Sequence, residues 1–347
     1  MFSFISQTMI ISALLADLGV ASAIIPRTST NTNTNGKTHW TRHDSIGLGP
    51  RQEHGVAGFG NAVFVVGGVR YNNNNTVETV NLVEYYAVNE QKWHVAAPLP
   101  QAVNHANAAA VDGRIYVLGS LSAGVNWTAL PETYVYTPGN DSWTALAPMP
   151  EGTARGASAI GVYNDTVYLA GGQLYLEIVP PYQQPGLDLV SSYNTTSNTW
   201  NTALPNLPQA RQHVSGTVVG STFYVIGGRE FDIHSFHNTT FALDLKNPTE
   251  WREMAQMPTA RGSLACAALG TVIYCFGGEG DASNEYEIFA QVEAYDTVTG
   301  TWSSLPPMDV PKHGAGAVAL DGRIWIPGGG VKTAMAPVGI VDSFEAL

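Results

Sequence analysis

Five cationic side chains recur at one position of a repeated sequence pattern, sixteen residues before a Gly-Gly or Gly-Ser pair. The five cations are Arg51, Arg155, Arg211, Arg261 and Lys312. In the remaining repeat Val103 occupies the position, which we call the cation position. The chain has only 16 Lys and Arg residues, so one position holds a large share of its positive charge. An arginine presents a rigid fork of donors to carboxylates and carbonyl oxygens. The pattern therefore predicts a binding site for an anion or an oxygen-rich molecule.

A second interpretation of these cations is structural. Each could bond to backbone carbonyls or to acidic side chains of the scaffold, and for any single arginine we favour this interpretation. Four histidines lie near the cation position and could act there as proton donors or acceptors. They are His54, His105, His213 and His313. We include His105 and His213 with the five cations in the predicted ligand site.

A polar loop after Gly228 offers a different kind of chemistry. Glu230, Asp232 and His234 combine carboxylates with an imidazole, which are suitable ligands for a divalent metal. Polar loops contain such groups by chance, so the three remain weak candidates and we predict no metal site. No nucleophile elbow, P-loop or dinucleotide fingerprint occurs, and no cofactor is predicted. Whether the chain is an enzyme stays open, and any catalysis would be acid–base or metal-assisted chemistry.

The elements that position these residues follow from the repeat itself. A strand of small residues, a two-residue turn, a bulky apolar strand and the glycine pair occur six times, and a tryptophan follows the first five. The turn pairs tolerate the positive φ that tight hairpins require. They are Gly60-Asn61, Asp112-Gly113, Asn164-Asp165, Gly220-Ser221, Gly270-Thr271 and Asp321-Gly322. Double glycines at a period of roughly 50 residues are the signature of kelch repeats, and the chain resembles the kelch family over residues 39–347.

The resemblance implies an all-β fold, a six-bladed β-propeller. Trp40 precedes Gly67 by 27 residues, and the other tryptophans precede their next glycine pair by 26 to 28. The segment around Trp40 is therefore expected to complete the blade that the C-terminus begins, which removes two free sheet edges. Ring closure would then bring the five cations around one channel mouth. In blade 3, an aromatic and proline-rich insertion (Leu174–Leu189) follows the glycine pair, where binding loops are often found; the alternative is a passive loop that covers the flank of the propeller.

The resemblance also indicates a range of functions. In kelch substrate adaptors, arginines at the cation position line the ligand pocket. As a whole the chain is similar to the stand-alone secreted kelch proteins of filamentous fungi, some of which accompany oxidases in secondary-metabolite pathways. This implies a protein that binds a small oxygen-rich organic ligand, with an accessory or a cofactor-free isomerase role. The alternative is an interaction module that binds a glycan or a protein through its loop face.

The leader and the sequons predict secretion. Residues 1–23 are read as a signal peptide that ends in a small-residue cleavage site, and residues 24–38 as a disordered linker. Six Asn-X-Ser/Thr sequons agree with a secreted glycoprotein. They begin at Asn74, Asn126, Asn140, Asn164, Asn194 and Asn238. The apolar leader is too short for a membrane span, and a net charge of -12 disfavours nucleic acid. We expect a monomer.

The two cysteines, Cys266 and Cys275, lie symmetrically about the turn at Gly270-Thr271. In a hairpin closed there, they face each other at a non-hydrogen-bonded pair, where side chains approach most closely. A cross-strand disulfide and two buried thiols both agree with this placement.

Overall fold

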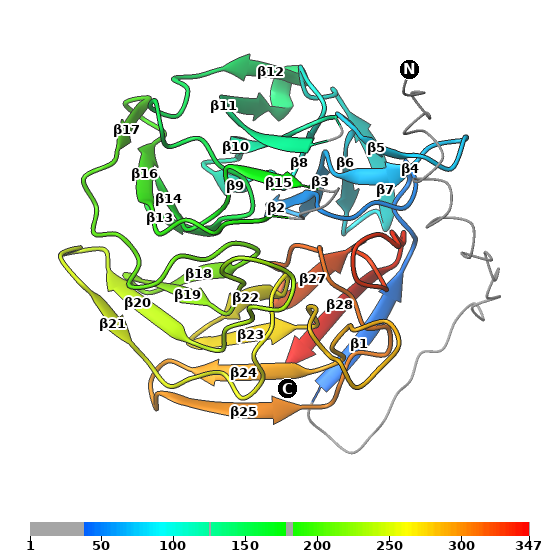
Figure 1. Cartoon of the computed structure of the whole chain (residues 1–347). Coiled ribbons are helices and arrows are strands. Elements are labelled where there is room, and N and C mark those ends of the chain that lie inside the picture. Colours follow the sequence, from blue (N-terminus) through cyan, green and yellow to red (C-terminus); the bar gives the residue numbers. More distant parts are fainter. Residues whose placement is uncertain (1–37, 125, 178–182, 347) are drawn as a thin grey trace, which may run out of the picture. The chain divides into compact units, whose positions relative to one another are not determined.

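The computed structural model describes residues 38–124, 126–177 and 183–346, which belong to one compact unit. The predicted signal peptide and almost all of the predicted linker lie outside these residues. Six antiparallel sheets are arranged around a central axis, and each is built on four strands (Figure 1). The predicted six-bladed, all-β propeller is therefore confirmed. In the described part of the chain, no helix is both long and apolar enough to span a membrane.

Each blade contains four strands in order from the axis outward. The innermost strands are β2 (Gly55–Phe59), β9 (Ala108–Val111), β13 (Ala159–Tyr163), β18 (Ser215–Val219), β22 (Ala265–Leu269) and β26 (Val318–Leu320). The second strands are β3 (Ala62–Val66), β10 (Arg114–Ser122), β14 (Thr166–Ala170), β19 (Thr222–Ile226), β23 (Val272–Phe276) and β27 (Arg323–Pro327). The third strands are β6 (Val83–Ala87), β11 (Asn126–Thr137), β16 (Val190–Asn194), β20 (Thr240–Asp244), β24 (Val292–Asp296) and β28 (Val341–Ala346). The outermost strands are β7 (Lys92–Ala96), β12 (Ser142–Ala145), β17 (Thr199–Asn201), β21 (Trp251–Glu253), β25 (Thr301–Leu305) and β1 (Thr38–His43).

The last blade is closed by the N-terminal strand. Strand β1 pairs antiparallel with β28, and Trp40 lies opposite Phe344 (Figure 1). The indole of Trp40 packs edge-on against Phe344 and against Phe276 of the preceding blade, with ring centroids 5.1 and 5.6 Å apart. The predicted closure at Trp40 is confirmed, and the propeller has no open seam between its first and last blades.

The same seam supplies a pH-dependent contribution to stability. His43 packs on Trp325 and bonds to Ser343, and burial, helped by the nearby Arg323, lowers the pKa of His43 to about 4. The ordinary histidine pKa is about 6.5. The folded state therefore favours the neutral imidazole. The contribution of His43 to the free energy of unfolding is complete above pH 6.5 and is lost as the pH falls from 6.5 toward 4. We expect His43→Gln to reduce the loss of melting temperature between pH 7.5 and pH 4.5. An equally steep loss in the variant would contradict this expectation.

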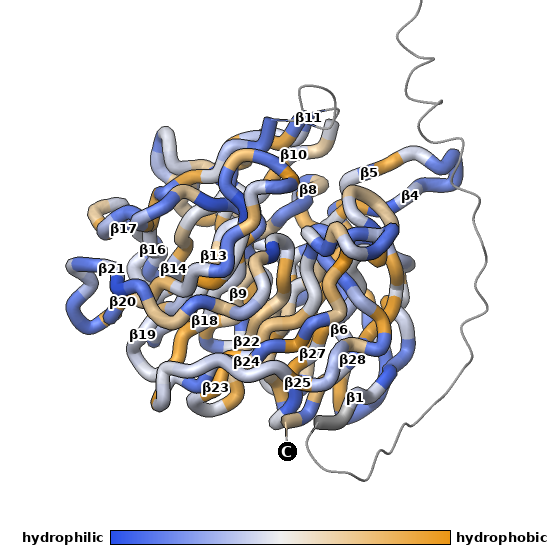
Figure 2. Tube along the Cα trace, turned by 60° about the horizontal axis from the view of Figure 1, so that its bottom comes forward, coloured by the Kyte–Doolittle hydropathy of each residue, from blue (hydrophilic) through white to orange (hydrophobic). Residues whose placement is uncertain are grey.

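Apolar side chains fill the spaces between blades. Six core clusters each join two neighbouring blades, and they follow one another around the ring. The repeated tryptophans seal the outer ends of these interfaces. In five blades the indole N–H donates to a backbone carbonyl at the preceding interface. These tryptophans are Trp93, Trp143, Trp200, Trp251 and Trp302. Hydrophobic residues accordingly lie on the strands, whereas the tip of the projecting hairpin formed by β4 (Val69–Tyr71) and β5 (Val77–Thr79) is hydrophilic (Figure 2).

The glycine pairs are required by close contact between blades. Gly277 has φ +55°, and a Cβ there would lie 2.1 Å from the carbonyl oxygen of Lys312 in the next blade. The amide of Gly278 donates to that same oxygen at 2.9 Å. The first glycine therefore leaves space for the neighbouring backbone, and the second binds it. The carbonyl that is bound belongs to the cation position of the next blade.

Loops after the glycine pairs join the second strand of a blade to its third, and they lie on the same face as the segments that lead from one blade to the next; we call this the loop face. The loops carry β4 (Val69–Tyr71), β5 (Val77–Thr79) and β15 (Tyr175–Glu177), and the segment between the first two blades carries β8 (Val103–Asn104). Strand β15, in the blade 3 insertion, pairs with β11 of blade 2, and the amides of Gln184 and Gly186 bond to the loop of blade 4. The insertion thus bridges its two neighbours. A short 3₁₀ helix, η1 (Pro138–Asn140), joins β11 to β12.

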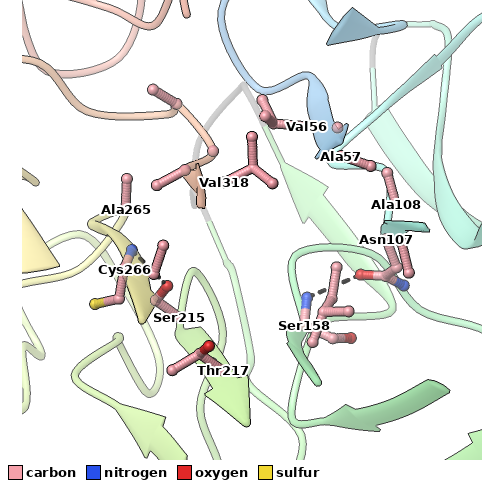
Figure 3. A pocket seen from close by; sticks show the side chains of 18 of the residues that line it. Val56, Ala57, Asn107, Ala108, Ser158, Ser215, Thr217, Ala265, Cys266 and Val318 are labelled. Atoms are coloured by element: carbon pink, nitrogen blue, oxygen red, sulfur yellow. Dashed lines mark hydrogen bonds between the residues drawn. The ribbon is translucent and has the colours of Figure 1, made fainter. Parts of the chain in front are cut away.

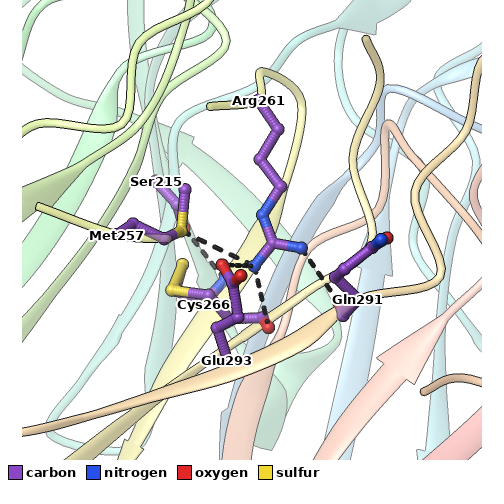
Figure 4. Close-up of a disulfide and its surroundings, with 7 residues drawn as sticks. Ser215, Met257, Arg261, Cys266, Gln291 and Glu293 are labelled. Atoms are coloured by element: carbon purple, nitrogen blue, oxygen red, sulfur yellow. Dashed lines mark hydrogen bonds and ion pairs between the residues drawn. A yellow bond between two sulfur atoms is a disulfide. The ribbon is translucent and has the colours of Figure 1, made fainter. Parts of the chain in front are cut away.

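The cysteines face each other in the β22–β23 hairpin, as predicted, and their sulfurs form a disulfide (Figure 4). The amide of Cys266 donates to the hydroxyl of Ser215 in the neighbouring blade rather than across the hairpin. This agrees with a non-hydrogen-bonded pair. The bridge lies beside Arg261 and Glu293, in the core between blades 4 and 5.

Candidate functional site

The structure corrects the expectation that the five cations line the channel mouth. Each side chain is at most 2% exposed and lies inside its own blade, where it bonds to the second or third strand or to residues directly beside these strands. The five are Arg51, Arg155, Arg211, Arg261 and Lys312. The physical reason is that a buried cation needs partners, and each blade supplies its own. These side chains are therefore part of the scaffold.

Three of the cations pair with an acidic residue on the third strand of the same blade. Arg51 pairs with Glu84, Arg261 with Glu293 at 3.0 Å, and Lys312 with Asp342 at 3.0 Å. The other two bond to uncharged groups. Arg155 donates to three backbone carbonyls and to Ser191. Arg211 donates to the Gly227 carbonyl, Thr239 and Gln209, and its guanidinium lies 4.7 Å from the ring centroid of Phe241.

The residue two positions after each cation position forms a ring at the loop-face end of the channel. Members of this channel ring all have φ between +47° and +57°, the left-handed region that is uncommon for residues other than glycine. They are Glu53, His105, Ala157, His213, Ser263 and Gly314. Five backbone hydrogen bonds join ring members of successive blades, at 2.7 to 3.1 Å. One of them, from Glu53 to Gly314, links the first blade to the last. The ring holds its side chains in fixed positions around the axis.

Three of the six ring members carry side chains that can do chemistry, and these side chains meet. The Nε2 atoms of His105 and His213 lie 2.9 Å apart. Glu53 Oε2 lies 3.2 Å from the first and 4.0 Å from the second. Both histidines are buried, and the Glu53 side chain is 12% exposed. Three residues separated by 52 and 108 positions in sequence thus form one compact cluster.

Neighbouring amides fix the protonation of the two imidazoles. The amide nitrogen of Asn104 donates to the Ser122 carbonyl, so its oxygen faces His105 Nδ1 at 2.6 Å. The amide nitrogen of Gln212 donates to the Gln184 carbonyl, so its oxygen faces His213 Nδ1. An amide oxygen only accepts, and each Nδ1 must therefore carry the proton. In the neutral rings each Nε2 atom therefore carries a lone pair. These two lone pairs are directed at each other and at Glu53.

A second layer of charge surrounds the cluster. His313 donates from Nε2 to the Lys332 carbonyl, so its Nδ1 is a lone pair at 3.6 Å from Glu279 and 3.9 Å from Glu53. Glu279 in turn pairs with Arg229 at 2.6 Å. The cluster thus places two carboxyl groups and one guanidinium among neutral imidazoles.

Burial controls the titration of these groups. Desolvation, followed by the nearby Glu279, raises the pKa of Glu53 to about 8, although Arg229 lowers it in part. Desolvation and Arg229 lower the pKa of His105 to about 3 and that of His213 well below its usual value. Near neutral pH the imidazoles are therefore neutral. Perturbed groups gathered beside a cavity are typical of functional sites.

The channel itself forms a cavity of about 390 Å³ next to this cluster. Its walls are the six innermost strands, whose small side chains leave the axis open, among them Ala57, Ala108, Ala265 and Val318 (Figure 3). Polar groups lie among them: Asn107 accepts a hydrogen bond from the amide of Ser158, and Ser215 and Thr217 lie on the wall (Figure 3). The cavity therefore has walls of small apolar and polar side chains, with titratable groups gathered at one end.

Comparison with known proteins follows the same repeats. Residues 50–100 match the Kelch motif, and residues 182–335 match the KLHDC2/KLHL20/DRC7 Kelch-repeats domain. Kelch-like protein terF of Aspergillus terreus is 40% identical over 299 residues, which cover 85% of this chain and 64% of that protein. The chain belongs to the kelch-repeat β-propeller family.

More distant kelch proteins are similar over most of the propeller. Kelch-like protein 36 of Rattus norvegicus is 27% identical over 250 residues, covering 71% of this chain and 39% of that protein. Kelch domain-containing protein 3 of Bos taurus is 27% identical over 263 residues, covering 66% of this chain and 64% of that protein. The kelch propeller described here thus spans less than two thirds of the length of each of these relatives.

The remaining predicted site residues of the kelch propeller lie away from the cluster. In the described part of the chain, Glu230, Asp232 and His234 do not converge on one point. The Asp232 carboxylate caps the amide of His234 at 2.7 Å, and Glu230 lies 3.5 Å from His237. His54 bonds to the Pro327 carbonyl beside the channel. Four sequon asparagines are exposed, whereas Asn194 and Asn238 are half-buried.

Sequence reasoning found His105 and His213 but missed Glu53. Glu53 can be found by aligning the six kelch repeats. The alignment column that corresponds to the ring position contains one glutamate, two histidines and three small residues. The supporting amides, Asn104 and Gln212, occupy the preceding column.

Proposed function

We propose that the protein binds a small, oxygen-rich organic molecule in the channel, against the Glu53–His105–His213 cluster. The observation that carries this proposal is a cavity of about 390 Å³ that is lined by small apolar and polar side chains and has titratable groups gathered at one end. Ligand pockets typically measure about 300–1,000 Å³ and combine apolar walls with a few convergent polar groups. The five buried cations take no part, because their charged groups are enclosed within the blades and bonded there.

The polar end favours a ligand that both donates and accepts hydrogen bonds. Glu53, held protonated near neutral pH, supplies a donor, and the lone pairs of His105 and His213 accept. Hydroxyl and carbonyl groups of an organic molecule complement this set. The same groups could move a proton between two positions of a bound ligand, which would be a cofactor-free isomerisation.

The proposed setting is a secreted accessory or isomerase-type protein of a fungal secondary-metabolite pathway. The 40% identity to a kelch-like protein of Aspergillus terreus supports a fungal protein of this kind. The disulfide and the exposed sequons support passage through an oxidising compartment, where disulfides persist. Secretion, glycosylation and the monomeric state are parts of this proposal.

A second candidate function is recognition of a glycan or a protein by the loop face. The observation that favours it is a set of large exposed apolar side chains on loops that follow glycine pairs. Leu174, Phe231 and Tyr286 are 41%, 62% and 53% exposed. Exposed aromatic residues on loops are common features of binding surfaces.

The channel proposal is tested by filling the cavity. Thr217 lines the channel and belongs to no core cluster, so Thr217→Phe should occupy ligand space without disturbing an interface between blades. Thr144→Phe, on the exposed outer strand β12, is the matched control. Native mass spectrometry would use a defined panel of hydroxylated benzoates, lactones and polyols, together with chitotetraose.

We expect the wild type to retain at least one hydroxylated member of the organic panel and the control to retain it equally. Thr217→Phe should bind the same compound at least about tenfold more weakly, a loss of roughly 1.4 kcal/mol of binding free energy. Equal binding by Thr217→Phe, or no binding of any organic member by the wild type, would contradict the channel proposal. Binding of chitotetraose that is reduced by Phe231→Ala would favour the loop face instead.

A further inference from the structure

The Glu53–His105–His213 cluster contains a conflict that hydrogen bonding within the chain does not resolve. Both Nε2 atoms are lone pairs, because the amide oxygens of Asn104 and Gln212 fix the protons on Nδ1. A proton on Glu53 can be donated to the nearer one, His105 Nε2, at 3.2 Å, but no proton of the chain lies between the two Nε2 atoms, which are 2.9 Å apart. Two acceptors at such a separation repel one another unless a proton or a cation lies between them.

The separations are those of ligands around one metal ion. For metal–ligand bonds of about 2.1 Å, two ligands at a right angle lie about 3.0 Å apart and two opposite ligands about 4.2 Å. The three separations here are 2.9, 3.2 and 4.0 Å, with His105 as the member close to both others. The cluster thus has the dimensions of a coordination site with little rearrangement.

The surroundings supply what a metal site needs. Metal-binding histidines usually donate their other N–H to an acceptor that fixes the ring, as His105 and His213 do to Asn104 and Gln212. When Glu53 gives up its proton, two carboxylates, of Glu53 and Glu279, face the guanidinium of Arg229, and a bound cation offsets the added negative charge.

A separate observation shows that a polar atom nearby lacks a partner. In the described part of the chain, Nδ1 of His313 is buried without a hydrogen-bond partner, although it faces both Glu53 and Glu279. Buried polar atoms are rarely left in this state unless a water molecule or an ion completes the site. This lone pair faces one carboxyl oxygen of Glu53, whose other oxygen lies beside His105 and His213.

The other ring members leave room for the cluster. Ala157, Ser263 and Gly314 are small, and a Cβ on Gly314 would lie 2.3 Å from Glu53 Oε1. A glycine at this position therefore permits the Glu53 carboxyl group to turn toward the two histidines.

From this geometry we propose that Glu53, His105 and His213 bind one divalent transition-metal ion at the loop-face end of the channel. Two imidazoles and one carboxylate suit zinc or iron(II) and leave positions open to further ligands. Those positions face the cavity, where an oxygen atom of an organic molecule could coordinate. The metal site does not rest on the proposed ligand, because the ion can be measured with no organic molecule present.

The experiment measures metal binding by the purified full chain after chelation. Zn²⁺, Fe²⁺, Cu²⁺ and Mn²⁺ are added separately, and uptake is measured by elemental analysis and by titration against a competing chelator. The variants His105→Ala and His213→Ser introduce residue types that the ring already carries at Ala157 and Ser263, so the positive φ is tolerated. His94→Ala removes a half-buried histidine on β7 that also lies beside a glutamate, and serves as the control.

We expect one tightly bound ion per wild-type chain and per control chain. Each ring variant should bind the ion at least roughly a hundredfold more weakly. The reason is that loss of even a hydrogen-bond partner of a metal ligand lowers metal affinity about 10- to 100-fold. If a ring variant fails to fold, Gln212→Leu provides a second test, with affinity reduced roughly 10- to 100-fold. Uptake of none of the four metals by the wild type, or equal affinity in the variants, would overturn the proposal.

Discussion

Replacing Glu293 with alanine is expected to lower the free energy of unfolding by about 3–5 kcal/mol, because it leaves Arg261 charged and buried without its counter-ion. Arg261 is fully buried, and its remaining contacts are the carbonyls of Gln291 and Cys275 and the sulfur of Met257. Those groups solvate the guanidinium only in part. The measurement is denaturant unfolding followed by tryptophan fluorescence.

A surface pair in the same chain provides the control for this change. Arg70 and Glu78 lie 2.6 Å apart, but their side chains are 34% and 33% exposed. Removal of one partner from such a pair costs about 0–1 kcal/mol, so Glu78→Ala should be close to neutral. A double replacement, Arg261→Met with Glu293→Leu, should recover most of the stability, because the buried charge disappears. Similar losses for Glu293→Ala and Glu78→Ala would contradict a scaffold role of the cation.

Gly277→Ala is expected to destabilise the propeller by roughly 3 kcal/mol through two separate effects. The positive φ costs about 1–2 kcal/mol for any residue with a Cβ. The Cβ also meets the Lys312 carbonyl at 2.1 Å, so the backbone must move and the hydrogen bond from Gly278 weakens, which adds about 1 kcal/mol or more. The measurement is the unfolding midpoint in guanidinium chloride.

Gly270→Ala separates the two effects. Gly270 has nearly the same φ, +61°, in the turn of the same blade, but a Cβ there meets nothing within 4 Å. This control should cost only the backbone strain, about 1–2 kcal/mol. If the two alanine variants are equally stable, the contact between neighbouring blades is not what requires the glycine pair.

The fold could be predicted from the sequence because its signals are local and repeated. The turn pairs, the bulky second strands and the glycine pairs recur at one spacing, and the position of Trp40 in that spacing identified the closing strand. The structure confirms each of these. The cysteine pairing followed from the hairpin register, although sequence alone left the oxidation state open.

The site could be predicted only in part, because the closed ring sets the direction of each side chain and the distances between residues of different blades. The cation position was conspicuous in the sequence, but loops of different length hide the acidic partners on the third strand, such as Glu84 and Asp342. A side chain two residues further along points to the axis instead, because the backbone there adopts a positive φ. Glu53 carries no motif of its own, and its role depends on histidines from two other blades.

Crystals of the zinc-loaded protein, measured with X-rays at the zinc absorption edge, test the central claim most directly. That claim is that closure of six blades brings Glu53, His105 and His213 to one point. We expect a single strong anomalous peak about 2.1 Å from the Nε2 atoms of both histidines and beside the Glu53 carboxylate. The absence of a peak there, or a peak only at a surface pair such as Glu230 and His237, would contradict the account.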